Sequence, residues 1–175
     1  MKYKKWNLAA PEGSAVQGLR QAGLPALAAV VLCARGLDTP AAAEAFLTAG
    51  EAPLHDPFLL KDMDRAAARL ALALDRQESI AVYGDYDVDG ITSTCLLTEF
   101  LRSRGGSVIP YIPDRMEEGY GLNREAIAAL HARGVGLIVT VDCGITAVEE
   151  AGCAAGLGVD LVITDHHECK EALPA

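Results

Sequence analysis

Four short apolar runs recur along the second two-thirds of the chain, and segments of helical composition separate them. The runs are residues 80–83, 108–112, 137–141 and 161–164. The helical segments between them lie at about residues 91–103, 124–133 and 147–155. A spacing of about 30 residues from one run to the next is typical of strand–helix–strand units. The pattern therefore predicts an α/β fold, in which a parallel β-sheet is flanked by helices on both faces.

The residues before this pattern have a different character. Residues 1–60 predict a lead-in of short alanine-rich helices at 14–22, 24–35 and 41–47, and an amphipathic helix follows over residues 62–77. We therefore expect a helical lead-in over residues 1–60 and an α/β domain over residues 61–175. No apolar run reaches the roughly 18 residues of a membrane span, and the N-terminus lacks the apolar core of a secretory signal. The chain is expected to be cytoplasmic and to have no membrane partner.

The net charge restricts the function classes. Residues 1–60 carry equal numbers of acidic and basic side chains, so the whole net charge of −9 lies in residues 61–175. This balance argues against unaided binding of nucleic acid, because Lys and Arg bind the phosphate backbone. It does not exclude a nuclease, because bound divalent cations offset carboxylates. The five cysteines form no CxxC pair and are expected to be reduced thiols.

Acidic and histidine residues follow three of the four apolar runs. They are Asp85, Asp87 and Asp89 after the first run, Asp142 after the third, and Asp165, His166 and His167 after the fourth. The carboxyl ends of parallel strands meet at one edge of a sheet, where ligands bind. Carboxylates gathered there would repel one another. Two divalent cations would relieve this repulsion, and a mixed oxygen and nitrogen ligand set suits Mn²⁺ or Mg²⁺ better than Zn²⁺. Such a pair of ions activates water against a phosphoryl group.

Other interpretations of these residues are possible. A single aspartate at the start of a helix is often only an N-cap, but this explains neither three alternating aspartates nor two histidines. An EF-hand loop requires Glu at its twelfth position, and counting from Asp85 gives Leu96 there. The aspartyl-phosphate motif of haloacid-dehalogenase-type phosphatases stays open for residues 87–91, although Ile91 stands where a threonine usually follows the glycine.

Three strings, in this order, resemble motifs I, II and III of the DHH phosphoesterases. They are YGDYDVDGITS at 83–93, VDCG at 141–144 and TDHH at 164–167. The strings KKWNL at 4–8 and PDRMEEGYGL at 113–122 resemble the members of this family that degrade single-stranded DNA. The resemblance implies a metal-dependent 5′→3′ exonuclease that acts in DNA repair and recombination. It implies Mn²⁺ or Mg²⁺ as cofactor and single-stranded DNA as substrate, and a single-strand-binding protein or a helicase is a candidate partner.

The resemblance also implies metal ligands. Asp87 and Asp89 would ligate the two metals, Asp142 would bridge them, and His166 would be a further ligand. Most family members have a histidine at the position of Tyr83, so Asp85 is expected to take the place of that missing ligand.

Further roles follow for residues around the metals. His167 would face the substrate phosphate, so His167 and Asp142 are the predicted catalytic residues, while Asp165 would orient a neighbouring histidine. Arg115 could clamp a phosphate, and Tyr120 could stack on a base. The alternatives are a surface arginine paired with Glu117 or Glu118, and a tyrosine that packs in a turn.

The length of the chain leads to a further expectation. The chain ends eight residues after His167, whereas the family plan continues into a further Asp motif, a DHHA1 domain and an oligonucleotide-binding domain. We therefore expect an N-terminal part of a DHH phosphoesterase that is weak or inactive by itself. The alternatives are another DHH phosphoesterase that acts on oligonucleotides or cyclic dinucleotides, and a non-catalytic metal-binding scaffold.

Overall fold

The computed structural model describes residues 8, 10–48, 54–116 and 118–174, which belong to two compact units, Met1–Asp56 and Pro57–Ala175. Each unit is described by itself. Most of the string at residues 4–8 and Glu117 lie outside the described residues. The division into a lead-in over 1–60 and a phosphoesterase domain over 61–175 stays a prediction.

The described residues of the first unit form the short helices α1 (Gly13–Gln21), α2 (Ala26–Ala34) and α3 (Pro40–Leu47). Helix α3 begins where its sequence favours a start, because Thr39 Oγ1 accepts a hydrogen bond of 3.2 Å from the Ala42 N–H and Pro40 occupies the first helical position. The three helices pack around a small core of Leu19, Ala29, Leu32, Cys33 and Ala43.

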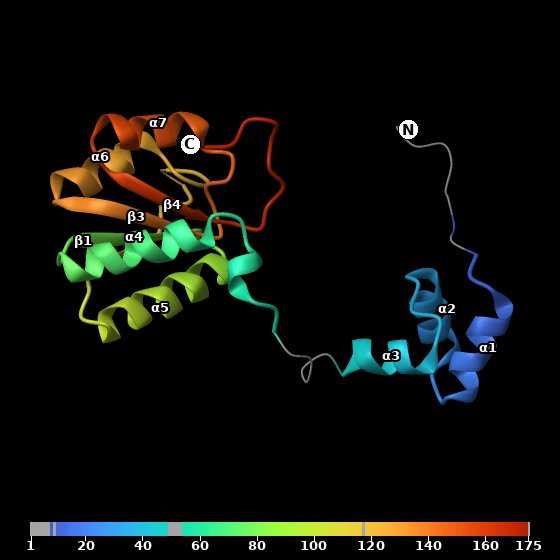
Figure 1. Ribbon diagram of the computed structural model, residues 1–175. Coiled ribbons are helices and arrows are strands. Elements are labelled where there is room, and N and C mark those ends of the chain that lie inside the picture. The colour runs from blue at the N-terminus through green and yellow to red at the C-terminus, as the bar shows by residue number, and fades with distance from the viewer. Residues whose placement is uncertain (1–7, 9, 49–53, 117, 175) are drawn as a thin grey trace, which may run out of the picture. The chain divides into compact units, whose positions relative to one another are not determined.

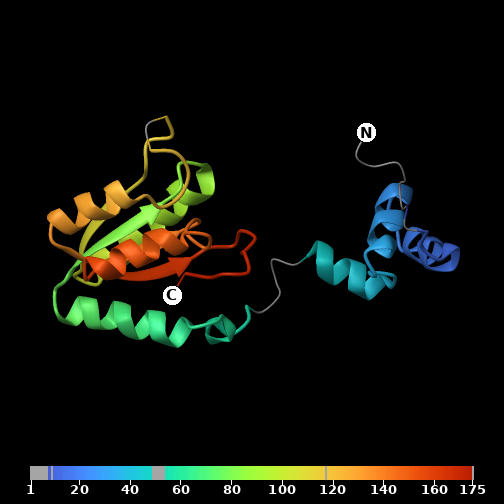
Figure 2. The ribbon, with the colours of Figure 1, turned by 90° about the horizontal axis from the view of Figure 1, so that it is seen from above.

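The second unit is a parallel four-stranded sheet with helices on both faces (Figures 1 and 2). Its elements are η2 (Pro57–Leu59), α4 (Met63–Asp75), β1 (Ser79–Gly84), α5 (Val88–Ser103), β2 (Ser107–Tyr111), α6 (Arg124–Ala132), β3 (Val135–Val141), α7 (Val148–Gly156) and β4 (Asp160–Thr164). All neighbouring strands are parallel, in the order β2-β1-β3-β4. The predicted α/β fold is confirmed. Among the described residues, no helix is long and apolar enough to cross a bilayer.

Each face of the sheet has its own core, and strand β1 contributes to both. Ile80 and Val82 of β1 pack with α4 and α5, whereas Ala81 and Tyr83 pack with α6 and α7. Because side chains alternate across a strand, a run that is apolar at every position fits a sheet covered on both sides. Figure 1 shows α6 and α7 over one face and α4 and α5 over the other.

The strand order of the sheet reverses direction at one point. Strand β1 leads through α5 to β2 on one side of it, and β2 leads back through α6 to β3 on the other side. The order therefore changes direction between β1 and β3, and in open α/β sheets ligands bind beyond the carboxyl ends of the strands at such a point. The segments that follow β1 and β3 carry the predicted ligands Asp85, Asp87, Asp89 and Asp142.

Candidate metal centre

The segment after β1 is held by a close approach between backbone groups. A Cβ atom built on Gly90 would lie 2.4 Å from the Asp85 carbonyl oxygen and 2.5 Å from the Asp85 nitrogen. Only glycine fits there, and its absence of a side chain lets the first turn of α5 pack against the end of β1. Asp85 is buried beneath this turn, and its Oδ1 accepts a hydrogen bond of 2.6 Å from the Tyr86 N–H.

Helix α5 begins at Val88, three residues before the predicted start at 91, because Asp87 caps it. The Asp87 Oδ1 atom accepts hydrogen bonds from the N–H groups of Asp89 (2.9 Å) and Gly90 (3.1 Å). The Gly90 N–H is the main reason that the pKa of Asp87 lies below its usual value. Asp87 is therefore a helix cap, as the simpler interpretation held, and is ionised at neutral pH.

The segment after β3 brings Asp142 into the site in an unusual backbone conformation. Asp142 has a φ of 63°, in the left-handed region, and its N–H donates to the Thr164 carbonyl at 3.0 Å. Two hydroxyl groups stabilise this turn: Thr140 Oγ1 donates to the Cys143 carbonyl and Thr164 Oγ1 donates to the Thr140 carbonyl, each at 2.7 Å. Strain at a left-handed non-glycine residue persists only where the surroundings hold it.

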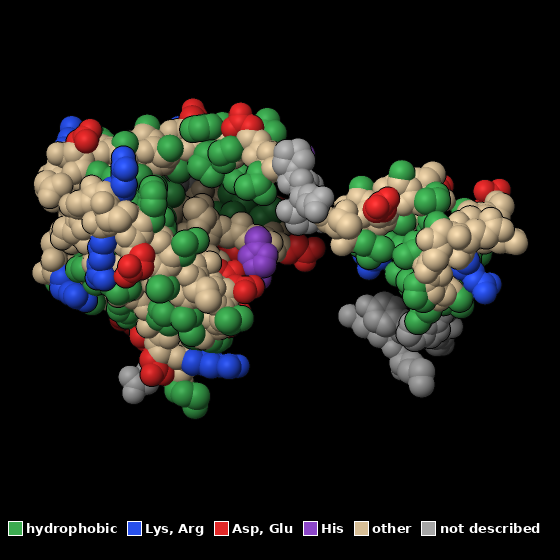
Figure 3. Space-filling view, turned by 90° about the horizontal axis from the view of Figure 1, so that it is seen from below, with side chains coloured by type: hydrophobic (Ala, Val, Ile, Leu, Met, Phe, Trp, Pro, Cys, Tyr) green, Lys and Arg blue, Asp and Glu red, His purple; other side chains and the backbone are tan. Residues whose placement is uncertain are grey.

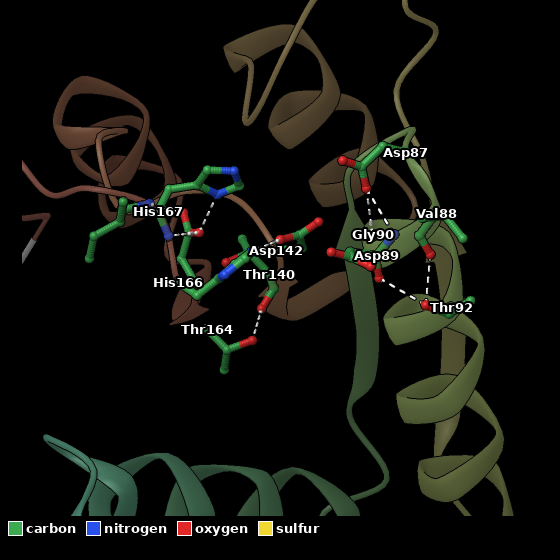
Figure 4. Close-up of polar contacts among 12 residues, drawn as sticks. Asp87, Val88, Asp89, Gly90, Thr92, Thr140, Asp142, Thr164, His166 and His167 are labelled. Atoms are coloured by element: carbon green, nitrogen blue, oxygen red, sulfur yellow. Dashed lines mark hydrogen bonds and ion pairs between the residues drawn. The ribbon is translucent and has the colours of Figure 1, made fainter. Parts of the chain in front are cut away.

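The Asp142 carboxylate is buried without hydrogen bonds. Its side chain is 4% exposed, and among the described residues neither carboxylate oxygen has a hydrogen-bond partner. His166 Nε2 lies 2.8 Å from Oδ1, within ion-pair distance (Figure 4). Burial, and then the nearby Asp87 carboxylate, raise the pKa of Asp142. A buried carboxylate that accepts no hydrogen bond and faces a second carboxylate is costly unless a cation completes its environment.

The segment after β4 supplies a paired aspartate and histidine. Asp165 Oδ1 accepts hydrogen bonds from the His167 N–H (3.0 Å) and from His167 Nδ1 (2.7 Å), and Oδ2 accepts one from the Ile145 N–H (3.0 Å). Burial opposes ionisation of Asp165, but these hydrogen bonds outweigh it and lower its pKa. The hydrogen bond to Asp165 in turn raises the pKa of His167.

These segments form two groups of candidate ligands that share one residue. The candidate ligand atoms of Asp85, Asp87 and Asp142 lie within 4.8 Å of one another, and so do those of Asp142, His166 and His167. Asp142 belongs to both groups, as a bridging ligand would. Figure 3 shows histidine and acidic side chains gathered at one edge of the second unit. The donor set, and the two oxygens of Asp142 that accept no hydrogen bond from the described residues, fit a pair of divalent cations.

Asp89 is placed differently from the other predicted ligands. It is exposed in the first turn of α5 (Figure 4) and belongs to neither of the two groups found among the described residues. Its role as a metal ligand stays a prediction, as do the roles of the other site residues.

An aromatic cluster of three rings adjoins the two groups, and sequence reasoning named only part of it. Tyr120 Oη lies 3.3 Å from His167 Nδ1, and the two rings meet edge to face with centroids 5.9 Å apart. Tyr86, which the sequence analysis did not single out, lies 6.3 Å from the Tyr120 ring, also edge to face. Burial is the main cause that raises the pKa of Tyr120 to about 12. The signal for Tyr86 was its position between two acidic residues at a strand end.

Arg115 and a small cavity complete the surroundings of this cluster. The Arg115 guanidinium lies over the Tyr86 ring, with Cζ 4.9 Å from the centroid. A cavity of about 190 Å³ opens beside Tyr120. Its lining consists of Tyr120, Gly121, Leu122, Gly144, Thr146, Ala147 and Glu150.

Tyr83, which stands where most family members have a histidine, points away from the site. Its side chain is fully buried in the core between the sheet, α6 and α7. The hydroxyl donates to the Gly121 carbonyl at 3.0 Å and accepts from Asn123 Nδ2 at 3.2 Å, and the ring stacks on Tyr111. Tyr83 therefore supports the loop after β2, and Asp85 is the neighbouring side chain that reaches the candidate ligands.

Comparisons with known proteins agree with this fold. Residues 79–175 match the DHH family, N-terminal domain. The chain is 44% identical over 171 residues to the single-stranded-DNA-specific exonuclease RecJ of Bacillus subtilis (strain 168). That match covers 97% of this chain but 22% of the relative, so the chain spans about a fifth of the length of this relative.

Solved structures of similar proteins contain metal ions. A crystal structure of exonuclease RecJ bound to manganese has a TM-score of 0.64 and 42% identity, and the match covers 70% of this chain and 31% of that one. RecJ from Thermus thermophilus in complex with Mn²⁺ has a TM-score of 0.68 and 31% identity, covering 95% and 23%. RecJ from the same organism in complex with Mg²⁺ has a TM-score of 0.54 and 28% identity, covering 91% and 19%.

Proposed function

The chain belongs to the DHH family, and from this premise we propose that it is the part of a metal-dependent phosphodiesterase that holds the metals, in a 5′→3′ exonuclease of single-stranded DNA. The observation that carries the proposal is the Asp142 carboxylate, which is buried, has no hydrogen-bond partner among the described residues and is shared by two groups of candidate ligands. The Bacillus subtilis relative is named as a single-stranded-DNA-specific exonuclease, which supports the proposed substrate. The place in DNA repair and recombination is proposed on the family resemblance alone.

Several residues of the chain would hold the metals. Asp85, Asp87 and Asp142 would surround one ion, and Asp142, His166 and His167 offer ligand atoms for a second. Oxygen-rich sites with histidine suit Mn²⁺ and Mg²⁺, and the solved relatives contain these ions. Bound there, such ions activate a water molecule and stabilise the charge that develops on the phosphoryl group. Asp89 would add a ligand from the first turn of α5.

The remaining residues would orient these ligands and the substrate. Asp165 fixes the ring of His167 through Nδ1, which leaves Nε2 as the free ring nitrogen that would face a phosphate or a metal. Arg115 would contact a backbone phosphate, because its guanidinium presents several donors to an anion. Tyr120 would stack against a base. A single-strand-binding protein or a helicase is proposed as a partner on the family resemblance alone.

The test uses the full open reading frame that encodes this chain, purified and freed of metal with EDTA. Hydrolysis of 5′-labelled and 3′-labelled single-stranded DNA is followed with and without Mn²⁺. We expect mononucleotides to appear from the 5′ end only when Mn²⁺ is present, and Asp142→Asn to abolish their release. Asp75→Asn, at an exposed carboxylate at the far end of α4, is the matched control and should behave as the wild type.

The outcomes distinguish the candidate functions. Release from the 3′ end, or cleavage only of very short oligonucleotides or cyclic dinucleotides, would replace the exonuclease proposal by another DHH phosphoesterase activity. Tight Mn²⁺ binding with no hydrolysis of any of these substrates would favour a non-catalytic scaffold. Hydrolysis that persists in Asp142→Asn would refute the two-metal assignment. The same assay on residues 1–175 alone tests whether this part is weak or inactive.

A further inference from the structure

We propose that Tyr86 is a positioning residue that holds the Arg115 guanidinium in place for a backbone phosphate of single-stranded nucleic acid. The inference deepens the proposed function and rests on it for the nature of the ligand. Neither the motif pattern nor the acidic character of this segment assigns a role to Tyr86. Its ring is nevertheless the contact between the segment that bears the candidate metal ligands and the loop that bears Arg115 and Tyr120.

The backbone of Tyr86 is fixed by its neighbours. Its N–H donates to Asp85 Oδ1 at 2.6 Å, and Asp85 is buried against the Gly90 backbone. The next residue, Asp87, caps α5. The Tyr86 ring therefore projects from a short segment that is anchored on both sides, and it can serve as a fixed support for a long, flexible side chain.

Arg115 lacks any other support of this kind among the residues that the structure describes. Its Cζ lies 4.9 Å from the centroid of the Tyr86 ring, within the roughly 6 Å of a cation–π contact. No salt bridge to Arg115 occurs within the described ranges. Glu118, one of its expected partners, instead accepts hydrogen bonds from the Tyr111 hydroxyl (2.6 Å), the Asp114 N–H (2.8 Å) and Asn123 Nδ2 (3.0 Å).

With no salt bridge to it among the described residues, the guanidinium can offer its donors to an anion. An arginine that stacks on an aromatic face keeps its N–H donors in the plane of the group, where an anion can accept from them. Tyr86 also meets Tyr120 edge to face, and Tyr120 meets His167 in the same way. The Tyr86 ring thus keeps Arg115 on the same side of the sheet edge as the predicted catalytic histidine.

The first experiment measures binding without catalysis, in the full open reading frame and in EDTA. The affinity for a fluorescent single-stranded oligonucleotide is measured over a range of salt concentrations for the wild type, Tyr86→Leu, Tyr86→Phe, Arg115→Ala and the double variant Tyr86→Leu/Arg115→Ala. The slope of log affinity against log salt is negative, and loss of one phosphate contact reduces its magnitude by about 0.7 on a single strand. We expect this loss in Arg115→Ala and most of it in Tyr86→Leu, whereas Tyr86→Phe keeps the ring and the wild-type slope.

The second experiment measures turnover with saturating Mn²⁺. Tyr86→Leu should raise KM about two- to fivefold, the factor that an exposed cation–π pair contributes, with kcat and the Mn²⁺ concentration for half-maximal rate unchanged. The double variant should be no worse than Arg115→Ala, because Tyr86 acts through Arg115. Circular dichroism checks that each variant is folded.

A wild-type salt slope in Tyr86→Leu would overturn the inference, and so would additive effects of the two substitutions. A changed requirement for Mn²⁺ in Tyr86→Leu would also overturn it, because it would assign Tyr86 to the metal ligands instead. Absence of any hydrolysis by the wild type contradicts the proposed function, and the binding series still decides the role of Tyr86.

Discussion

Asp142→Asn should stabilise the metal-free protein while it abolishes the proposed activity. In the wild type both carboxylate oxygens of Asp142 are buried without hydrogen-bond partners among the described residues, and the Asp87 carboxylate is close enough to raise the pKa of Asp142. The substitution removes a buried negative charge that the Asp87 carboxylate repels, and the new amide supplies a donor that can reach Asp87. His166, with Nε2 2.8 Å from Asp142 Oδ1, offsets only part of the cost of this charge, because burial and Asp87 still raise the pKa of Asp142 overall. Asparagine also tolerates the left-handed backbone at this position, so the strain at φ 63° is not increased.

The expected change in stability can be estimated from the cost of the buried carboxylate. An unsatisfied buried polar group costs about 1–3 kcal/mol, so relief of part of this cost should raise the free energy of unfolding by about 1–2 kcal/mol. For a unit of this size the melting temperature should then rise by about 3–8 °C. Mn²⁺ at 100 times its dissociation constant would add about 2.7 kcal/mol to the wild type. The variant, which lacks the shared ligand, should gain much less.

The melting temperatures of the wild type and Asp142→Asn should therefore change order between EDTA and Mn²⁺. Thermal melts of the full open reading frame should rank Asp142→Asn above the wild type in EDTA and below it in Mn²⁺, while Asp75→Asn matches the wild type in both. A lower melting temperature for Asp142→Asn in EDTA would refute the reasoning, since it would show that the carboxylate stabilises the fold without a metal. Equal gains from Mn²⁺ in both proteins would refute the placement of the metals.

Two further predictions concern the segments that support the site. Gly90→Ala should lower the free energy of unfolding by about 2 kcal/mol or more and also weaken Mn²⁺ binding, because the new methyl group would lie 2.4 Å from the Asp85 carbonyl oxygen. Calorimetry measures the first effect and Mn²⁺ titration the second, and a wild-type affinity for Mn²⁺ would contradict the prediction. The hydrogen bond from the Tyr111 hydroxyl keeps the pKa of Glu118 below its usual value of 4.5, so the stability that Glu118 contributes is present above about pH 4.5 and lost as the pH falls through the lowered pKa. Melting temperatures measured down to about pH 3 should therefore decline less steeply for Glu118→Gln than for the wild type, and parallel declines would count against this role of Glu118.

The sheet was predictable because each strand contains an uninterrupted apolar run of three or more residues. The predicted run 137–141 differs from β3 by two residues at one end, and the predicted run 161–164 differs from β4 by one. The start of α5 was predicted too late because Asp87 and Gly90 have the composition of a loop. A capping aspartate and a glycine that allows close packing nevertheless start a helix. Such a contact depends on tertiary structure, which hydrophobic periodicity does not encode.

The candidate site was predictable to a similar degree. Parallel strands bring the residues after β1, β3 and β4 to one edge, so the meeting of Asp85, Asp87 and Asp142 followed from topology. The contact between Tyr86 and Arg115 did not, because the course of the loop after β2 depends on hydrogen bonds made by side chains such as Glu118. No pattern in the sequence specifies these.

The candidate metal ligands lie far apart along the chain, and this affects how the metal centre forms. Asp85 and Asp142 are 57 positions apart but project from adjacent strands, so no short peptide contains the complete ligand set. High affinity for metal should then appear only once β3 has docked beside β1, and a nascent or partly unfolded chain would bind metal weakly. Mn²⁺ release would thus report detachment of β3, and partial unfolding would abolish the proposed activity together with metal binding.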